Sequence, residues 1–285
     1  MITEADNLKE QIAQQREAIV RLTAELEETN KGVIALYAEL DDNALQLRDA
    51  ADLKSRFLSY MSHEFRTPLA SITSIANILL AGMDGPLTAE QQRQIHFVQG
   101  SVRELTEMVD DLLDLAKVEA GRISISPEWF EMVDLFSALR GMFKPIVATG
   151  DVALIFEEPH SVPRVYTDDK KLSQILRNFI SNGLKFTPKG EVRVTARLLE
   201  GEMLEFAVSD TGIGIAPDHL PALFSDFVQL DTRLQKRLRG TGLGLSLAKK
   251  FALLLGGRVA VDSTLGKGSR FSVVIPSRYT SGAPA

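Results

Sequence analysis

The chain has 285 residues, 45% of them apolar, which suits one large or two ordinary domains and is too balanced for a disordered protein. A net charge of −6, from 32 basic and 38 acidic residues, argues against nucleic acid or an anionic membrane surface as a partner. The absence of cysteine excludes disulfides, thiolate metal sites and thiol catalysis, and a reducing cytoplasm is the expected location.

No membrane segment is predicted. The first residues lack an apolar h-region, and no stretch approaches the roughly 18 apolar residues of a membrane span. We therefore expect a soluble chain. A start on a charged helix is equally what a piece of a longer protein would show, and the sequence leaves this open.

Residues 1–50 carry a heptad pattern. One apolar row is Ile12, Ile19, Leu26, Val33, Leu40 and Leu47, and a second is Leu8, Leu22, Leu36 and Ala50. The second row is interrupted by the polar residues Gln15, Thr29 and Asn43, which weaken a coiled coil but specify its register. The pattern predicts a parallel, dimeric coiled coil. The alternative is a single amphipathic helix packed on a globular body, for which a shorter stripe would be enough.

Residues 51–121 predict a helical hairpin. A first helix is expected to stop at 82–86, and Thr88 is the expected N-cap of a second helix with Glu90 and Gln91 in its first turn. The second helix ends at Gly121. Each helix has an apolar stripe, and the two stripes of one hairpin would cover each other only poorly. Two hairpins from two chains would form a closed four-helix bundle, so a homodimer is expected.

His63 lies between Met61 and Phe65, two residues of the first helix's apolar seam. It is displaced by about 200° around a 3.6-residue helix and is expected to point to water. A neutral imidazole is a competent nucleophile, and Glu64 could take its ring proton or select its tautomer. Pro68 should kink the helix nearby. An isolated histidine of this kind is usually only a solvated residue.

Residues 122–279 show short β-type runs, the first of them RISISP, which alternate with helical stretches. The pattern predicts an α+β domain of about 155 residues, with a mixed or antiparallel sheet covered by helices on one face. Residues 280–285 are expected to be a disordered tail.

Four polar or glycine-rich segments in this region could bind a nucleotide. Asn178 and Asn182 share one helical face and offer neutral oxygens for Mg²⁺, although a pair of solvated amides is the alternative. Asp210 ends a strand, where its carboxylate could accept the exocyclic amino group of adenine, so ATP is favoured over GTP. The following Gly212 and Gly214 would let the backbone turn closely around the base.

The two remaining segments are rich in glycine. Residues 239–246 precede an amphipathic helix, so that backbone N–H groups and a helix N-terminus could face phosphates. The spacing is neither that of a P-loop nor that of a Rossmann fingerprint. The other segment, 266–269, lies in a turn before a strand.

The segment FLSYMSHEFRTPL resembles the H-box of sensor histidine kinases of the HisKA class, and the other segments resemble, in order, the N-box, glycine boxes and F-box of a GHKL, or Bergerat-type, ATPase domain. The resemblance runs from about residue 50 to about residue 277. It implies a fold of α plus α/β type: a coiled coil at 1–50, a HisKA hairpin at 51–121 and an α+β sandwich at 122–279.

The resemblance also implies roles for individual residues. His63 would be the phosphoacceptor, Glu64 the general base and Thr67 the residue that supports hydrolysis of a phosphorylated regulator. Asn182 would bind Mg²⁺ beside Asn178, and Lys185 would contact phosphate. The remaining ATP-binding positions would be Asp210, Gly212, Gly214, Phe224, Phe227, Arg239, Gly240, Thr241, Gly242, Leu243, Gly244, Leu245 and Gly268.

Three departures or additions accompany the resemblance. Gly183 stands where the family commonly has Ala, and Ser225-Asp226 where it often has Glu-Pro. The lid would also carry the cations Arg233, Lys236 and Arg237. The expected activity is ATP-dependent phosphorylation of His63 and transfer to an aspartate of a separate response regulator, with an upstream sensor as input.

Three other functions remain open. They are a degenerate scaffold that binds ATP without chemistry, a chaperone-type or topoisomerase-type ATPase, and a protein whose main output is phosphatase action through Thr67. The second class usually places a catalytic Glu where this chain has Asn178. The stimulus, the cognate regulator and the cis or trans direction of phosphorylation are not readable from the sequence.

Overall fold

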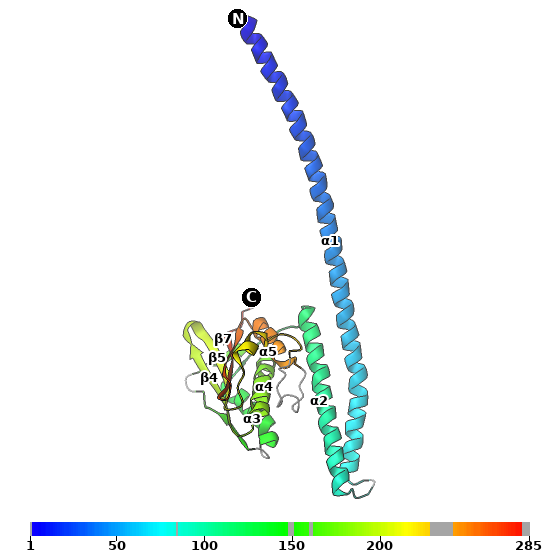
Figure 1. Cartoon of the computed structure of the whole chain (residues 1–285), viewed down its shortest axis with the longest axis vertical. Coiled ribbons are helices and arrows are strands. Elements are labelled where there is room, and N and C mark those ends of the chain that lie inside the picture. Colours follow the sequence, from blue (N-terminus) through cyan, green and yellow to red (C-terminus); the bar gives the residue numbers. More distant parts are fainter. Residues whose placement is uncertain (1, 84, 148–150, 160–161, 229–241, 281–285) are drawn as a thin grey trace. The chain divides into compact units, whose positions relative to one another are not determined.

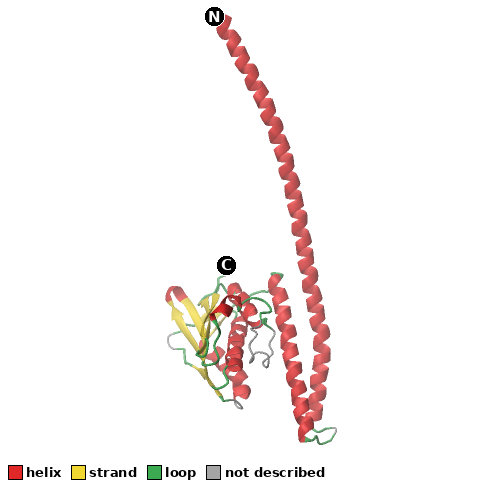
Figure 2. Cartoon of the chain, viewed as in Figure 1, coloured by secondary structure: helices red, strands yellow, loops and turns green. Residues whose placement is uncertain are grey.

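A computed structural model describes residues 2–83, 85–147, 151–159, 162–228 and 242–280 (Figure 1). The chain divides into two compact units, Met1–Phe57 and Leu58–Ala285, which are described separately. A single helix makes up the described part of the first unit, and the second combines helices with strands (Figure 2). Across the described ranges, no helix combines the length and the apolar character needed to cross a bilayer.

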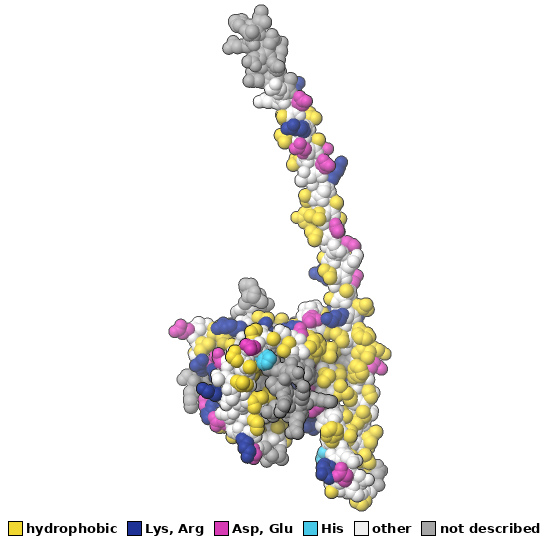
Figure 3. Space-filling model, viewed as in Figure 1, with side chains coloured by type: hydrophobic (Ala, Val, Ile, Leu, Met, Phe, Trp, Pro, Cys, Tyr) yellow, Lys and Arg dark blue, Asp and Glu magenta, His cyan; other side chains and the backbone are white. Residues whose placement is uncertain are grey.

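The first unit is formed by helix α1 (Ile2–Leu80), which continues into the second unit. From Ile19 to Leu47 the predicted seam is exposed on the single helix, with Leu26 62% and Leu47 72% accessible. Apolar side chains recur along this helix (Figure 3). The hydroxyl of Thr29, in a predicted polar layer, donates to the Glu25 carbonyl at 2.8 Å and is satisfied within the helix. The coiled-coil dimer itself stays a prediction.

In the second unit, the end of α1 and α2 (Ala89–Glu119) form the predicted hairpin. An ion pair joins Arg66 of α1 to Asp110 of α2 at 2.6 Å, and Gln99 donates to Asn77 at 2.8 Å. Apolar side chains stay exposed on both helices, among them Phe65, Ile72, Ile75, Val98 and Leu105. This exposed stripe is what a second hairpin would cover in a four-helix bundle.

The turn between the two helices follows the predicted chemistry. Helix α1 ends at Leu80, and Gly82 adopts φ +70° just beyond it. Thr88 is the N-cap of α2 and forms a capping box with Gln91, which confirms the predicted cap. Helix α2 is followed by Gly121 at φ +64°, again as expected.

The part of the second unit that follows α2, called the α/β domain here, contains two sheets among its described residues. A small one pairs β1 with β3 antiparallel, and a five-stranded one has the order β2-β4-β5-β7-β6, in which only β2 and β4 are parallel. The elements are β1 (Glu128–Phe130), α3 (Met132–Val147), β2 (Val152–Phe156), β3 (Val165–Thr167), α4 (Asp169–Phe186), β4 (Gly190–Leu199), η1 (Glu200–Glu202), β5 (Met203–Asp210), η2 (Pro217–Ala222), α5 (Gly244–Leu254), β6 (Arg258–Thr264) and β7 (Gly268–Pro276).

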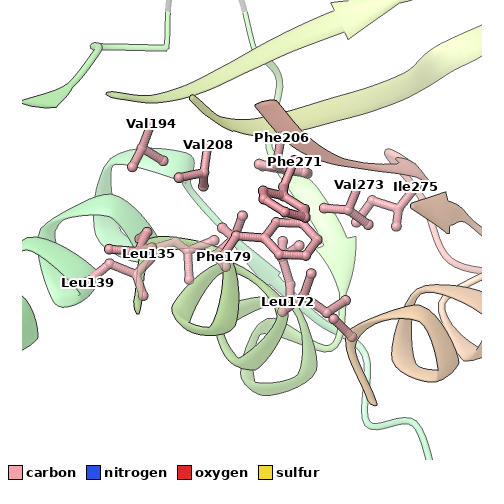
Figure 4. Close-up of a cluster of buried hydrophobic side chains, with 14 of the residues drawn as sticks. Leu135, Leu139, Leu172, Phe179, Val194, Phe206, Val208, Phe271, Val273 and Ile275 are labelled. Carbon is pink, nitrogen blue, oxygen red and sulfur yellow. The ribbon is translucent and has the colours of Figure 1, made fainter. Parts of the chain in front are cut away.

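Helices cover one face of the large sheet, as the sequence predicted (Figure 1). Apolar residues at helical spacing in α3 and α4 meet the inward residues of β4, β5 and β7 in one core (Figure 4). The rings of Phe179 from α4 and Phe271 from β7 lie 5.6 Å apart at its centre. The opposite face carries charged ladders such as Arg197–Glu205–Arg270.

One predicted strand is wrong. Residues 122–127, which include RISISP, form no strand, and β1 begins at Glu128. Ile123 and Ile125 instead pack against the core. The amide of Ser126 donates to the Asp168 carboxylate at 3.0 Å. The alternation of apolar and polar residues in RISISP therefore comes from a loop that is anchored to the domain, not from a strand.

Asp168 joins that loop to α4. The residue is only 4% exposed, and as the N-cap of α4 it also accepts from the Lys171 amide at 3.0 Å. We expect Asp168→Ala to lower the free energy of unfolding by about 2–4 kcal/mol, because it removes a cap and leaves a second amide unpaired. Urea unfolding followed by the fluorescence of Trp129, the chain's single tryptophan, measures this.

Asp168→Asn is the matched control, because it keeps the cap acceptor and should cost only about 1 kcal/mol. If alanine and asparagine destabilised the domain equally, the cap acceptor that asparagine keeps would contribute nothing to stability.

Candidate functional site

His63 lies on the exposed surface of α1, as predicted. A shallow hollow beside it is lined by His63, Arg66, Thr67, Ala70, Ser71 and Ser74. The Thr67 hydroxyl donates to the His63 carbonyl at 3.2 Å, one turn away. Glu64, the next residue along the helix, is exposed as well. An accessible ring nitrogen beside a carboxylate and an arginine can act as a nucleophile toward a phosphoryl group.

The N-box residues lie on α4, where Asn178 and Asn182 follow each other by one turn and are partly buried. The Asn178 side-chain amide donates to the Gly244 carbonyl at 2.9 Å, which ties α4 to the start of α5. Two motifs 66 residues apart therefore meet. Burial lowers the pKa of Lys185 on the same helix, and the Glu104 carboxylate of α2 opposes that shift.

Asp210 ends β5, and its carboxylate accepts from the Gly212 amide at 2.8 Å. Burial raises the pKa of Asp210, while the amides of Gly212 and Ser269 and the nearby Thr187 hydroxyl act in the opposite direction. Thr187 is 2% exposed, and its Oγ1 has no well-aligned hydrogen-bond partner among the described residues. A partly buried carboxylate beside a buried hydroxyl suits a polar ligand such as adenine.

Thr187 was not singled out from the sequence. It is the C-cap of α4 in the segment KFTPKG, directly after the predicted N-box helix. A threonine at a helix end is normally a local cap, so sequence alone offers little reason to assign it to a ligand. Its burial beside Asp210 is the observation that identifies it.

Two of the glycine positions pack tightly against backbone. A Cβ on Gly214, which has φ +66°, would lie 2.0 Å from the Thr264 carbonyl oxygen, and one on Gly268, with φ +104°, would lie 1.9 Å from that of Asp210. The amide of Gly266 donates to Ile213 at 2.7 Å. These contacts join the loop after β5 to the β6–β7 turn. The two glycines therefore allow these two backbone segments to pack against each other.

The phosphate side of the candidate site is formed at α5. Leu243 is its buried N-cap residue, and Gly244 and Leu245 open the helix, where the first N–H groups have no intrahelical acceptor. The Phe227 amide donates to the Gly242 carbonyl at 3.1 Å.

The two F-box aromatics differ. Phe224 packs against the core, whereas Phe227 has φ +62° and is 62% exposed. Arg239, Gly240 and Thr241, together with the predicted lid cations Arg233, Lys236 and Arg237, lie outside the described residues.

The donor set fits ATP. Asp210 with Thr187 offers a polar end for the base, and the start of α5 with Lys185 offers a cationic end for the phosphates. Within the described part of the chain, no cluster of three or more His, Cys, Asp or Glu residues could hold a metal ion. The amide oxygens of Asn178 and Asn182 suit Mg²⁺ that the triphosphate itself would help to hold.

The family described as "Histidine kinase-, DNA gyrase B-, and HSP90-like ATPase" matches residues 167–279, and the family described as "His Kinase A (phospho-acceptor) domain" matches residues 53–121. A sensor-like histidine kinase of Rhizobium meliloti (strain 1021), itself uncharacterised, is 39% identical over 243 residues, which cover 85% of this chain and 46% of that protein. The circadian input-output histidine kinase CikA of Synechococcus elongatus is 38% identical over 250 residues, which cover 86% of this chain and 33% of CikA.

The crystal structure of full-length ShkA in complex with AMPPNP is similar in fold, with a TM-score of 0.64 and 32% identity over 81% of this chain and 48% of ShkA. The chain thus spans less than half the length of these relatives. From the two matched domains and these relatives, the chain belongs to the sensor histidine kinases and carries both a phospho-acceptor domain and a histidine kinase-type ATPase domain.

Proposed function

We propose that this chain is an ATP-dependent protein histidine kinase that phosphorylates His63 and passes the phosphoryl group to an aspartate of a separate response regulator. One observation carries the proposal. The phospho-acceptor domain presents an exposed imidazole, and an ATPase domain follows it in the same chain. Domain boundaries at 50/51 and 121/122 are part of the proposal.

In this mechanism the α/β domain binds the nucleotide. Asp210 accepts a hydrogen bond from the adenine amino group, with Thr187 beside it, while Lys185 and the start of α5 bind phosphates. Asn182 holds Mg²⁺, which neutralises charge on the triphosphate when bound. The partly buried carboxylate at the base end favours adenine over guanine, because guanine presents a carbonyl there.

The chemical step is an in-line displacement at the γ-phosphorus. A ring nitrogen of His63 forms the new P–N bond, the bond from phosphorus to the bridging oxygen breaks, and ADP leaves with the bonding electrons. Glu64 accepts the proton that the imidazole loses. The resulting phosphohistidine is a donor to the carboxylate of an aspartate, and the histidine regains a proton in that transfer.

A homodimer is part of the proposal. The exposed apolar stripes of the hairpin and of α1 support it, because a second copy that covers them removes their apolar surface from water. An upstream sensor acting through α1 would provide the input, and Thr67 would support hydrolysis of the phosphorylated regulator.

Transfer of label tests the proposal as a whole. The chain is incubated with γ-labelled ATP and Mg²⁺, freed of nucleotide, and then mixed with a panel of purified receiver domains. We expect label to leave the kinase within minutes for its cognate receiver and far more slowly for the others. Steady ATP hydrolysis without labelled protein would instead favour a chaperone-type ATPase.

A further inference from the structure

Lys250 on α5 lies between two carboxylates that belong to different parts of the Leu58–Ala285 unit. Its ammonium group is 3.0 Å from Asp226 Oδ2 and 3.4 Å from Glu119 Oε1. Glu119 is the last residue of α2, whereas Asp226 belongs to the α/β domain. The three side chains are partly shielded from water, with Lys250 25% exposed. We call Lys250, Glu119 and Asp226 the Lys250 latch.

Asp226 is the closer partner and orients the lysine. It occupies one of the positions where the sequence departs from the family's common Glu-Pro, and a proline there could not supply a carboxylate. Because Asp226 and Lys250 lie in the same domain, their pair limits the freedom of the long lysine side chain. The ammonium group is then directed toward Glu119 at reduced entropic cost.

Glu119 lies where α2 ends. The amide of Arg122 donates to Lys117 and that of Gly121 to Val118, both at 2.9 Å, which closes the helix. The linker is next held at Ser126 by Asp168. Between these two anchors lie only residues 123–125, of which Ile123 and Ile125 pack against the core of the α/β domain. A second polar contact, Gln174 to Asp114 at 3.0 Å, also docks that domain on α2.

The hollow beside His63 is lined by residues of α1 alone. The described residues of the α/β domain therefore do not line it in this arrangement, and transfer to the same chain's His63 requires the domain to leave its docked position. Val118 of α2 also packs against the core of the α/β domain. The ion pairs of Lys250 are partly open to water, and contacts of that kind can break and re-form.

We propose that the Lys250 latch holds the α/β domain docked on the end of α2 and thereby slows phosphorylation of His63. Lys250 is a positioning residue, since it contacts neither the reacting atoms nor the nucleotide-binding residues named above. The inference rests on the proposed kinase function and adds a device that sets its rate.

The kinetic test compares variants of the full chain at saturating ATP. Lys250→Met, which keeps the stem and removes the charge, should raise kcat for autophosphorylation about two- to fivefold, the range for a partly exposed ion pair, with KM for ATP changed less than about twofold. Glu119→Gln should do the same, and the double variant should gain little more than either single one. Lys250→Arg should stay near the unmodified rate.

Lys189→Met is the matched control. Lys189 forms an ion pair with Asp151, and both residues lie in the α/β domain. The variant removes the same charge without affecting a contact to α2, so it should leave kcat unchanged. An unchanged or lower kcat in Lys250→Met, or additive effects of Lys250→Met and Glu119→Gln, would overturn the latch.

A distance measurement separates failure of the latch from failure of the kinase proposal. The chain contains no cysteine, so Glu107→Cys on α2 and Arg258→Cys on β6 provide unique, exposed positions for spin labels. With labelled chains diluted in unlabelled ones, Lys250→Met should broaden the distance distribution. An unaltered distribution contradicts the latch whether or not the unmodified chain labels His63, whereas absence of label on His63 contradicts the kinase proposal alone.

Discussion

Replacing His63 by glutamine is expected to abolish incorporation of the γ-phosphoryl group of ATP into the chain. Glutamine is similar in size and can hydrogen-bond, but its amide nitrogen is not nucleophilic, so no P–N bond forms. His63 is exposed on α1, and the substitution removes no buried contact. The measurement is acid-labile, base-stable label on the protein after incubation with γ-labelled ATP and Mg²⁺. ATP affinity should stay within about twofold of the unmodified value.

His96→Gln is the matched control for this experiment. His96 is also an exposed helical histidine of the hairpin, on α2, and its ring contacts Gln99 at 3.3 Å. It should retain full labelling. Histidine-type label that persists in His63→Gln would refute the assignment of the phosphoacceptor.

Mixing two variants extends the same experiment to the dimer, at an ATP concentration too low to label chains with Asp210→Asn alone. Chains with His63→Gln keep the ATP site, and chains with Asp210→Asn keep the acceptor. Label that returns in the mixture requires the ATP site of one chain to serve the histidine of its partner, whereas a dimer that stays unlabelled indicates phosphorylation within one chain.

The second large effect is expected for Asp210→Asn, which should weaken ATP binding about 10- to 100-fold. The change removes a charged acceptor, worth about 1.5–3 kcal/mol when its hydrogen bonds are buried. It also places a donor amide next to the Gly212 amide, which already donates to this side chain. Titration with a non-hydrolysable ATP analogue measures the loss.

The pH dependence has a defined sign. Burial raises the pKa of Asp210 above its ordinary value. Because adenine needs the ionised carboxylate, affinity is retained above this raised pKa and falls as the pH drops through it. For stability the sign is reversed: the proton is bound more tightly in the folded chain, so the contribution is present at low pH and lost as the pH rises through the folded pKa.

Two controls isolate the contribution of Asp210. The same pH titration with Asp210→Asn measures the pH dependence that comes from protonation of the nucleotide itself, and this contribution is subtracted from that of the unmodified chain. Asp218→Asn alters an exposed carboxylate a few residues away and should leave affinity unchanged. Equal losses in Asp210→Asn and Asp218→Asn would mean that net charge, rather than a specific contact, governs binding.

Much of the fold could be predicted because local patterns agree with it. The heptads of α1 and α2, the Thr88 cap and the alternation in β4, β5 and β7 each depend on neighbours along the chain. The failure at 122–127 has a long-range cause, since the alternating isoleucines there pack on a core assembled from distant segments and Ser126 bonds to Asp168.

Gly183 illustrates the same limit. The sequence suggests only a slightly loosened helix where the family commonly has Ala. In the structure a Cβ at this position would lie 3.0 Å from Val192 Cγ1, so the close approach of β4 favours the small residue. No pattern within α4 contains that information.

The sequence by itself determined the family, the acceptor histidine as a candidate and the order of the nucleotide motifs, because these depend on residue types at short, regular spacings. Only the tertiary structure decided which distant groups meet: Asn178 with Gly244, Thr187 with Asp210, and Lys250 with both Glu119 and Asp226. Such contacts arise from how helices and strands pack, and packing depends on the whole core rather than on any segment of the chain.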